Sequence, residues 1–151
     1  MTNIGAHAYA DVEGGLKTWL SSHAVIAPLV GATGSPLKNA RVFLGMPSGG
    51  VRAWPTLVVF RIGGGPLSAV DYPADFANVQ IDCWGNIGDK VGCFLLTQTV
   101  VRTLLDLSCG TLMSSAVRVL GVSSVTVPYI PDRDNGRPRY SVSAVIQVQA
   151  V

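Results

Sequence analysis

The sequence predicts a single α+β domain, in which two helices pack on one face of a largely antiparallel or mixed β-sheet of about five strands. Apolar residues recur with helical spacing in two segments, residues 12–23 and 89–107. Other segments are rich in β-branched residues or alternate between apolar and polar ones, in hairpin-like runs. The predicted order is helix, three strands, helix and two strands. No linker divides residues 1–151, and we expect residues 1–9 to form a loose N-terminal arm.

The first half of the chain contains the first helix and two strands. Asp11 stands in the N-cap position of the helix. Proline and glycine then mark a loop over residues 28–36, and a short strand follows at residues 41–45 (RVFLG). Residues 55–62 (PTLVVFRI) form a strongly β-branched strand. We expect the glycine- and proline-rich residues 63–74 (GGGPLSAVDYPA) to be a flexible connection.

The third strand is predicted within residues 75–86, DFANVQIDCWGN, where side chains alternate between two faces. One face holds Ala77, Val79, Ile81 and Cys83, and the other holds Phe76, Asn78, Gln80, Asp82 and Trp84. The first set suits a core beneath the helices. The second set mixes polar and aromatic side chains, so it is either a solvated face with an incidental tryptophan or a surface that meets a partner.

The second half contains the longer helix and two long strands. The helix over residues 89–107 is predicted to bury one apolar stripe, made of Val91, Phe94, Leu95, Val101, Leu104 and Leu105. The strands cover residues 116–127 and 139–149. The last strand alternates clearly, with Tyr140, Val142, Ala144, Ile146 and Val148 directed inward.

The composition is unusually apolar for a chain of this size. Hydrophobic residues make up 48% and charged residues only 13%, with a mean hydropathy of +0.40 and a net charge of +2. A typical soluble domain has about 25% charged residues. The surface is therefore either poor in charge or covered by neighbouring subunits, because obligate interfaces resemble a core cut in half. The small net charge does not by itself indicate nucleic-acid binding.

Targeting and membrane signals are not found in the sequence. No apolar run approaches the roughly 18 residues that a spanning helix needs. The first residues lack the basic and apolar regions of a signal peptide. The three cysteines form no CxxC pair, which suits a reducing cytosol.

Motifs for catalysis or for metal and cofactor binding are also not found, so we predict no enzyme activity and no cofactor. The two histidines, His7 and His23, stand near no nucleophile elbow, and with three scattered cysteines they form no zinc pattern. DRDNG (132–136) lacks the spacing of a calcium loop and is typical of a turn. The glycine-rich stretches do not match a phosphate-binding loop.

Arginines gather in two places. They are Arg41, Arg52 and Arg61 around the first strands, and Arg133, Arg137 and Arg139 near the last turn. A solvated rim and a docking rim both fit this pattern, since arginine is enriched at interfaces. A DNA-reading patch fits less well, because Asp132 and Asp134 interrupt the second group.

The whole pattern resembles the tail-terminator (tail completion) proteins of long-tailed bacteriophages. The resemblance rests on the opening helix DVEGGLKTWL, the strand PTLVVFRI, the strand DFANVQIDCWG before the helix KVGCFLLTQTVVRTLLDL, and the final PDRDNGRPRYSVSAVIQVQ. It covers residues 11–149 and includes no catalytic signature.

The resemblance implies a structural virion protein that is assembled in the host cytoplasm. It would form a hexameric ring at the head-proximal end of a siphovirus-like tail tube and stop tube polymerisation. Its partners would be the tail tube protein and the head-completion or connector protein. DNA would pass through the lumen without sequence-specific binding, and no membrane would be involved.

For such a ring, we expect one face of the third strand, with Phe76, Gln80, Asp82 and Trp84, to lie at or near a subunit boundary. The predicted loops over residues 45–54 and 63–73, and the last turn, are candidates for contacts with the tube or the head. The docking candidates are Met46, Arg52, Trp54, Leu67, Tyr72, Arg133 and Arg137.

Three other functions remain open from the sequence. The chain could be a different neck component, such as a head-completion or adaptor protein. It could be a cytosolic module that binds a small molecule under its glycine-rich loops. A hydrolase using Ser48 or a cysteine would need an acid–base partner that the sequence does not display.

Overall fold

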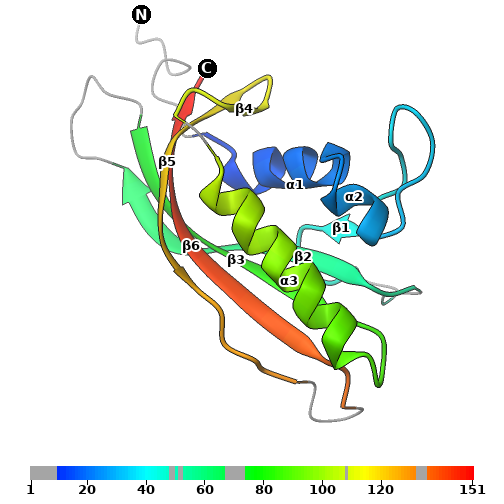
Figure 1. The fold of residues 1–151 in the computed structure, drawn as a ribbon. Coiled ribbons are helices and arrows are strands. Elements are labelled where there is room, and N and C mark those ends of the chain that lie inside the picture. Colours follow the sequence, from blue (N-terminus) through cyan, green and yellow to red (C-terminus); the bar gives the residue numbers. More distant parts are fainter. Residues whose placement is uncertain (1–9, 48–49, 51–52, 67–73, 108, 132–135) are drawn as a thin grey trace, which may run out of the picture.

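The computed structural model describes residues 10–47, 50, 53–66, 74–107, 109–131 and 136–151. Its helices are α1 (Val12–Ser22), α2 (Ile26–Leu29) and α3 (Lys90–Leu105). Its strands are β1 (Val42–Phe43), β2 (Thr56–Pro66), β3 (Ala74–Trp84), β4 (Leu112–Ser114), β5 (Val117–Thr126) and β6 (Arg139–Ala150). Figure 1 shows a curled sheet with the helices on one side, which confirms the α+β class.

The described residues form one sheet of six strands in the order β1-β2-β3-β6-β5-β4, one more than expected. The additional strand is β4, a three-residue segment that pairs with the start of β5. It is too short to show a periodic pattern in the sequence. All neighbouring strands are antiparallel except β1 and β2, which run parallel, so the sheet is mixed.

Helix α1 forms as predicted. The Asp11 side chain accepts a hydrogen bond from the Gly14 N–H at 3.0 Å, which satisfies one of the free amides of the first turn. Leu16 and Leu20 are completely buried. Gly15 lies directly against Val117 of β5, because a Cβ at this glycine would stand 3.1 Å from the valine side chain. The glycine therefore lets the helix approach the sheet closely.

The buried face of α3 agrees with the predicted stripe only at Leu104, which is completely buried, and at Val101, which is partly buried. The helix buries Cys93, Leu96, Thr97, Val100, Thr103 and Leu104, whereas Val91, Phe94, Leu95 and Leu105 are exposed. Two threonines belong to the buried face because their hydroxyls donate to helix carbonyls, Thr97 to Cys93 at 2.8 Å and Thr103 to Thr99 at 2.7 Å. Apolar residues therefore occupy both sides of α3, and the sequence pattern alone assigned four exposed residues to the core.

The predicted connection after residue 62 is partly wrong as well. Strand β2 continues through the three glycines to Pro66, opposite β3. Gly64 has a φ of +88°, and a Cβ there would collide with the carbonyl oxygen of Phe76. Glycine is required because the two backbones approach closely at this point. Glycine usually weakens the interior of a strand, which is why residues 63–66 were expected to lie in a loop.

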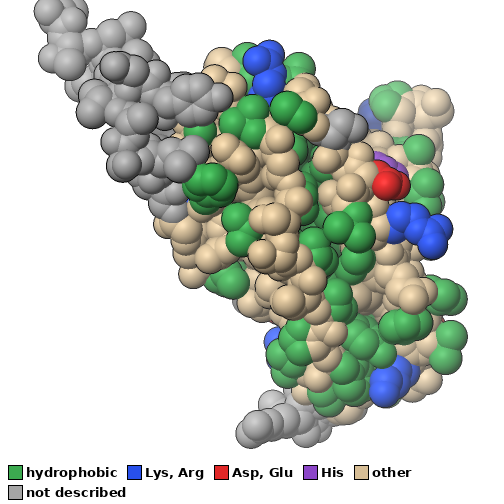
Figure 2. Space-filling model, turned by 60° about the vertical axis from the view of Figure 1, so that its left-hand side comes forward, with side chains coloured by type: hydrophobic (Ala, Val, Ile, Leu, Met, Phe, Trp, Pro, Cys, Tyr) green, Lys and Arg blue, Asp and Glu red, His purple; other side chains and the backbone are tan. Residues whose placement is uncertain are grey.

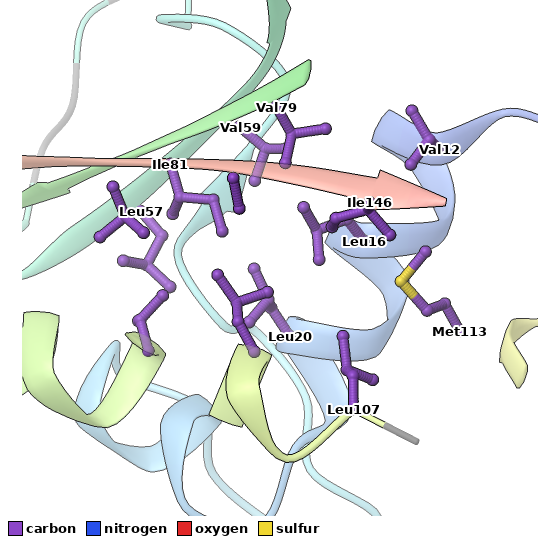
Figure 3. Packing of buried hydrophobic residues seen from close by; sticks show 14 of the residues in the cluster. Val12, Leu16, Leu20, Leu57, Val59, Val79, Ile81, Leu107, Met113 and Ile146 are labelled. Carbon is purple, nitrogen blue, oxygen red and sulfur yellow. The ribbon is translucent and has the colours of Figure 1, made fainter. Parts of the chain in front are cut away.

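The core lies between the helices and the covered face of the sheet (Figure 3). Strand β3 contributes the predicted residues Ala77, Val79, Ile81 and Cys83, all completely buried. Strand β6 contributes Val142, Ala144, Ile146 and Val148, as its alternation predicts. Tyr140 points to the same face but is only half-buried, against Phe94 with ring centroids 5.7 Å apart.

Candidate functional site

Seven of the eleven residues expected at contacts lie in the described part of the chain. Gln80, Asp82 and Trp84 are near one end of β3, while Phe76 is near the other end and 37% exposed. Met46 is exposed on the segment before β2. Arg52, Leu67, Tyr72 and Arg133 lie outside the described residues, as do the expected arm of residues 1–9 and Ser48.

The structure brings Trp54, Trp84 and Arg137 together with Arg139 in a Trp–Arg stack. The Arg137 guanidinium lies 3.9 Å from the centre of the Trp54 ring. The two tryptophan ring centroids are 5.9 Å apart, and the Arg139 guanidinium lies 4.7 Å from the Trp84 ring. Such cation–π contacts each contribute about 0.5–2 kcal/mol. The stack connects the segment before β2 with β3 and with the start of β6.

Asp82 is buried beside this stack and is satisfied within the chain. Its Oδ1 accepts hydrogen bonds from Ser141 Oγ and Gln80 Nε2, both at 2.8 Å. Its Oδ2 lies 3.6 Å from Arg139 Nη1. Trp84 is also buried, and its Nε1 has no hydrogen-bond partner among the described residues. The boundary role of this end of β3 stays a prediction, and any neighbour would meet Trp54, Arg137 and Arg139 there more directly than Asp82.

A second surface was missed by sequence reasoning. The exposed face of α3, with Val91, Phe94, Leu95 and Leu105, forms a ridge that we call the α3 ridge. Figure 2 shows hydrophobic side chains gathered at the lower end of the molecule, where Figure 1 places the starts of α3 and β6. The same apolar pattern that was assigned to the core marks this surface. No signal in the sequence separates the two faces, because the buried face carries two polar threonines and the exposed face carries large apolar residues.

Two grooves flank the α3 ridge. One, of about 490 Å³, runs between α3 and the end of β5, and its apolar lining is Phe94, Val101, Leu105, Val127 and Tyr140. The other, of about 580 Å³, runs between α1 and α3 and includes Trp19, His23, Arg102 and Asp106. Exposed apolar patches of this kind mark contact sites between proteins. The arrangement of these apolar side chains is suited to binding.

Among the described residues, His23 has a structural role and no metal centre is formed. His23 Nδ1 accepts the backbone N–H groups of Val25 and Ile26 at 3.2 and 3.3 Å, and its ring packs edge-on against Trp19. It therefore closes α1 and orients α2. Within the described ranges, no three His, Cys, Asp or Glu side chains are grouped as metal ligands. No described helix is both long and apolar enough to cross a membrane.

The cysteines provide a test of the packing at the sheet end. Burial raises the pKa of the Cys83 thiol strongly, and it raises that of Cys93, whose Sγ donates to the Cys83 carbonyl at 3.1 Å. Cys109 is exposed. Since the thiolate is the reactive form, we expect one thiol to react rapidly with an aromatic disulfide reagent at pH 8 and three to react after denaturation. Fast reaction of two or three thiols in the native protein would contradict this packing.

No protein-family model matches the chain, and no curated protein matches its sequence. Among solved structures, its fold is similar to that of a chain in the virion of a native gene transfer agent particle. The similarity has a TM-score of 0.69 at 15% sequence identity, and it covers 91% of this chain and 94% of that chain. At this identity the comparison establishes the fold, over nearly the whole length of both chains.

Proposed function

We propose that the chain is a structural, non-enzymatic virion protein of a phage-like particle, and specifically a tail terminator. It forms a hexameric ring at the head-proximal end of the tail tube, stops tube polymerisation and joins the tail to the head-completion or connector protein. The observation that carries the proposal is the near full-length fold similarity to a gene transfer agent virion chain. The residues that resemble terminator proteins support the finer assignment.

The surfaces of the chain agree with a ring subunit. Only 13% of residues are charged, and the α3 ridge exposes large apolar side chains between two grooves. A subunit in a ring meets its two neighbours through different faces, so two unlike surfaces must both be suited to contact. The α3 ridge and the Trp–Arg stack are two unlike surfaces, each suited to a contact with a neighbouring subunit, the tail tube or the head-completion protein.

The helix-free face of the sheet suits a lumen through which DNA passes. In β3 and β6 its middle rows pair Asn78 with Val145, Gln80 with Ser143 and Phe76 with Gln147, so they mix polar and apolar side chains and carry no charge. Sequence-independent DNA binding comes mainly from Lys and Arg contacts to phosphate. A lumen lined by these rows would let DNA pass without binding it tightly, because they offer no Lys or Arg side chain to the phosphates.

The test is tail length in particles made without this gene, measured by negative-stain microscopy beside a complemented control. We expect overlong, headless tubes in the deletion strain and uniform tails when the protein is restored. If tails of normal length appear beside DNA-filled, tailless heads, the protein acts on the head side of the joint as a head-completion or adaptor protein. If complete particles form without it, the virion function is wrong.

A further inference from the structure

We propose that neighbouring copies of this chain join edge to edge, with the unpaired edge of β5 in one copy forming an antiparallel ladder with the unpaired edge of β2 in the next. The joined sheets then form one continuous wall. This deepens the proposed function, on which it rests for the requirement that the array closes into a ring.

Within the described part of the chain, both edges of the sheet are open over most of their length. On one side, β1 pairs only with Leu57 and Val58, so residues 59–66 of β2 have an outer edge that no described segment pairs with. On the other side, β4 pairs with Val117 and Arg118 at the start of β5. Beyond Val119, whose backbone still bonds to Gly110 and Thr111, the edge over residues 120–126 is likewise unpaired in the described chain.

The two open stretches stand at the same level of the sheet. The strand registers place Phe60, Gln80, Ser143 and Thr126 in one row. They place Gly64, Ala77, Ile146 and Val122 in a second row. A rotation about an axis parallel to the strands, without a shift along it, therefore brings one open stretch beside the other. Zero shift is the condition for a closed ring, since a shift would produce a helical filament.

The strand directions also agree. Strand β2 is antiparallel to β3, β3 to β6, and β6 to β5, so β2 and β5 run in opposite directions. After rotation, β5 of one copy and β2 of the next form an antiparallel pair. Each edge also contains a bulge at the level of Ala144, between Arg61 and Gly63 in β2 and between Ser123 and Thr126 in β5. Both strands consequently bend at the same height.

The side chains along these edges do not protect them from pairing. Natural edge strands are commonly guarded by charged residues, especially lysine, by proline, by a bulge or by a covering element. Proline stands only at the end of the β2 stretch, at Pro66, and the two bulges stand at the same level, so they do not offset the two strands. Residues 120–126 (LGVSSVT) contain no charge. In β2 the only charged residue of residues 59–66 is Arg61, whose guanidinium is engaged by Asp75. Three successive glycines leave the β2 backbone accessible. A second copy of the chain is a suitable partner, because its β2 edge lies in the same rows as the β5 edge of the first copy and runs in the opposite direction.

Engineered disulfides test the pairing directly. Gly63 and Ser123 both belong to the row of Asn78 and Val145, so they are neighbours across the proposed joint. A Cβ at Gly63 would stand 3.7 Å from Asn78 Nδ2, an ordinary contact, and Ser123 is exposed. Opposed Cβ atoms of an antiparallel pair lie about 4.5–5.5 Å apart, near the separation that a disulfide bridges. The Gly63→Cys/Ser123→Cys variant is made in a Cys109→Ser background.

After mild oxidation by dissolved oxygen with a copper catalyst, the double variant should give a reducible ladder at multiples of 15.8 kDa that ends in one closed species. A mixture of the two single variants should stop at dimers, because each joint uses one cysteine from each edge. Gly63→Cys/Arg118→Cys is the matched control, since Arg118 lies where β4 pairs with β5. This control should give no ladder.

The oxidation is carried out on the purified protein and on assembled particles, and the oligomeric state is measured by light scattering. Oligomers or particles without a ladder would overturn the edge pairing and leave the proposed function standing, with the contact elsewhere. A ladder in the control variant would also overturn it. A closed ladder from a protein whose deletion leaves tails unchanged would support the joint and refute the terminator function.

Discussion

Replacing Leu104 with alanine is expected to lower the free energy of unfolding by about 2–5 kcal/mol, the usual cost of deleting a buried leucine side chain. Leu104 is completely buried on the face of α3 that packs on the sheet. The neighbouring Leu105→Ala is expected to change stability by no more than about 0.5 kcal/mol, as for surface substitutions. Leu105 is 61% exposed on the α3 ridge.

The two variants form a matched pair because the substitution, the helix and the position along it are nearly the same. Urea unfolding followed by circular dichroism measures both, at a protein concentration where the light scattering of each is equal. Equal losses for the two leucines would contradict the orientation of α3. A larger loss for Leu105 would place Leu105 in the core and Leu104 at the surface.

Replacing Arg61 with leucine is expected to cost about 3–5 kcal/mol of stability, because it leaves a buried carboxylate without its partner. The Arg61 guanidinium contacts both Asp75 oxygens, with Nη2 to Oδ1 at 2.8 Å, and its Nε donates to the Gly63 carbonyl at 3.2 Å. Hydrogen bonding to Asp75 raises the pKa of Arg61. The Asp75 side chain is only 2% exposed, so water cannot replace the lost contacts.

The control for this prediction is the double variant Arg61→Leu/Asp75→Leu. Replacing a buried ion pair by apolar side chains is often close to neutral, so the double variant should recover most of the stability lost in the single one. Denaturant midpoints of the wild type, the two single variants and the double variant complete the cycle. If Arg61→Leu alone costs less than about 1 kcal/mol, the pair does not hold the β2–β3 hairpin together.

The candidate site was only partly predictable. Gln80, Asp82 and Trp84 were singled out because a polar and aromatic strand face is unusual, and Trp54 and Arg137 because they occur in turn-like segments. The stacking of these two residues with Trp84 and Arg139 could not be predicted from the sequence. It depends on where β2, β3 and β6 meet. The α3 ridge was invisible because a helix with apolar residues on two sides has two equivalent amphipathic assignments.

The sequence by itself determined the features that depend on local chemistry. These are the Asp11 cap of α1, the alternation that buries one face of β3 and β6, and the α+β class. Only the tertiary structure decided which side of α3 is buried, that the glycines before Pro66 belong to a strand, and that β4 exists. In each of these cases the local pattern permits two outcomes, and packing against residues distant in the sequence selects one. The tertiary structure also decided that the open edges of β2 and β5 lie in the same rows of the sheet. This alignment depends on the registers of four strands, β2, β3, β6 and β5.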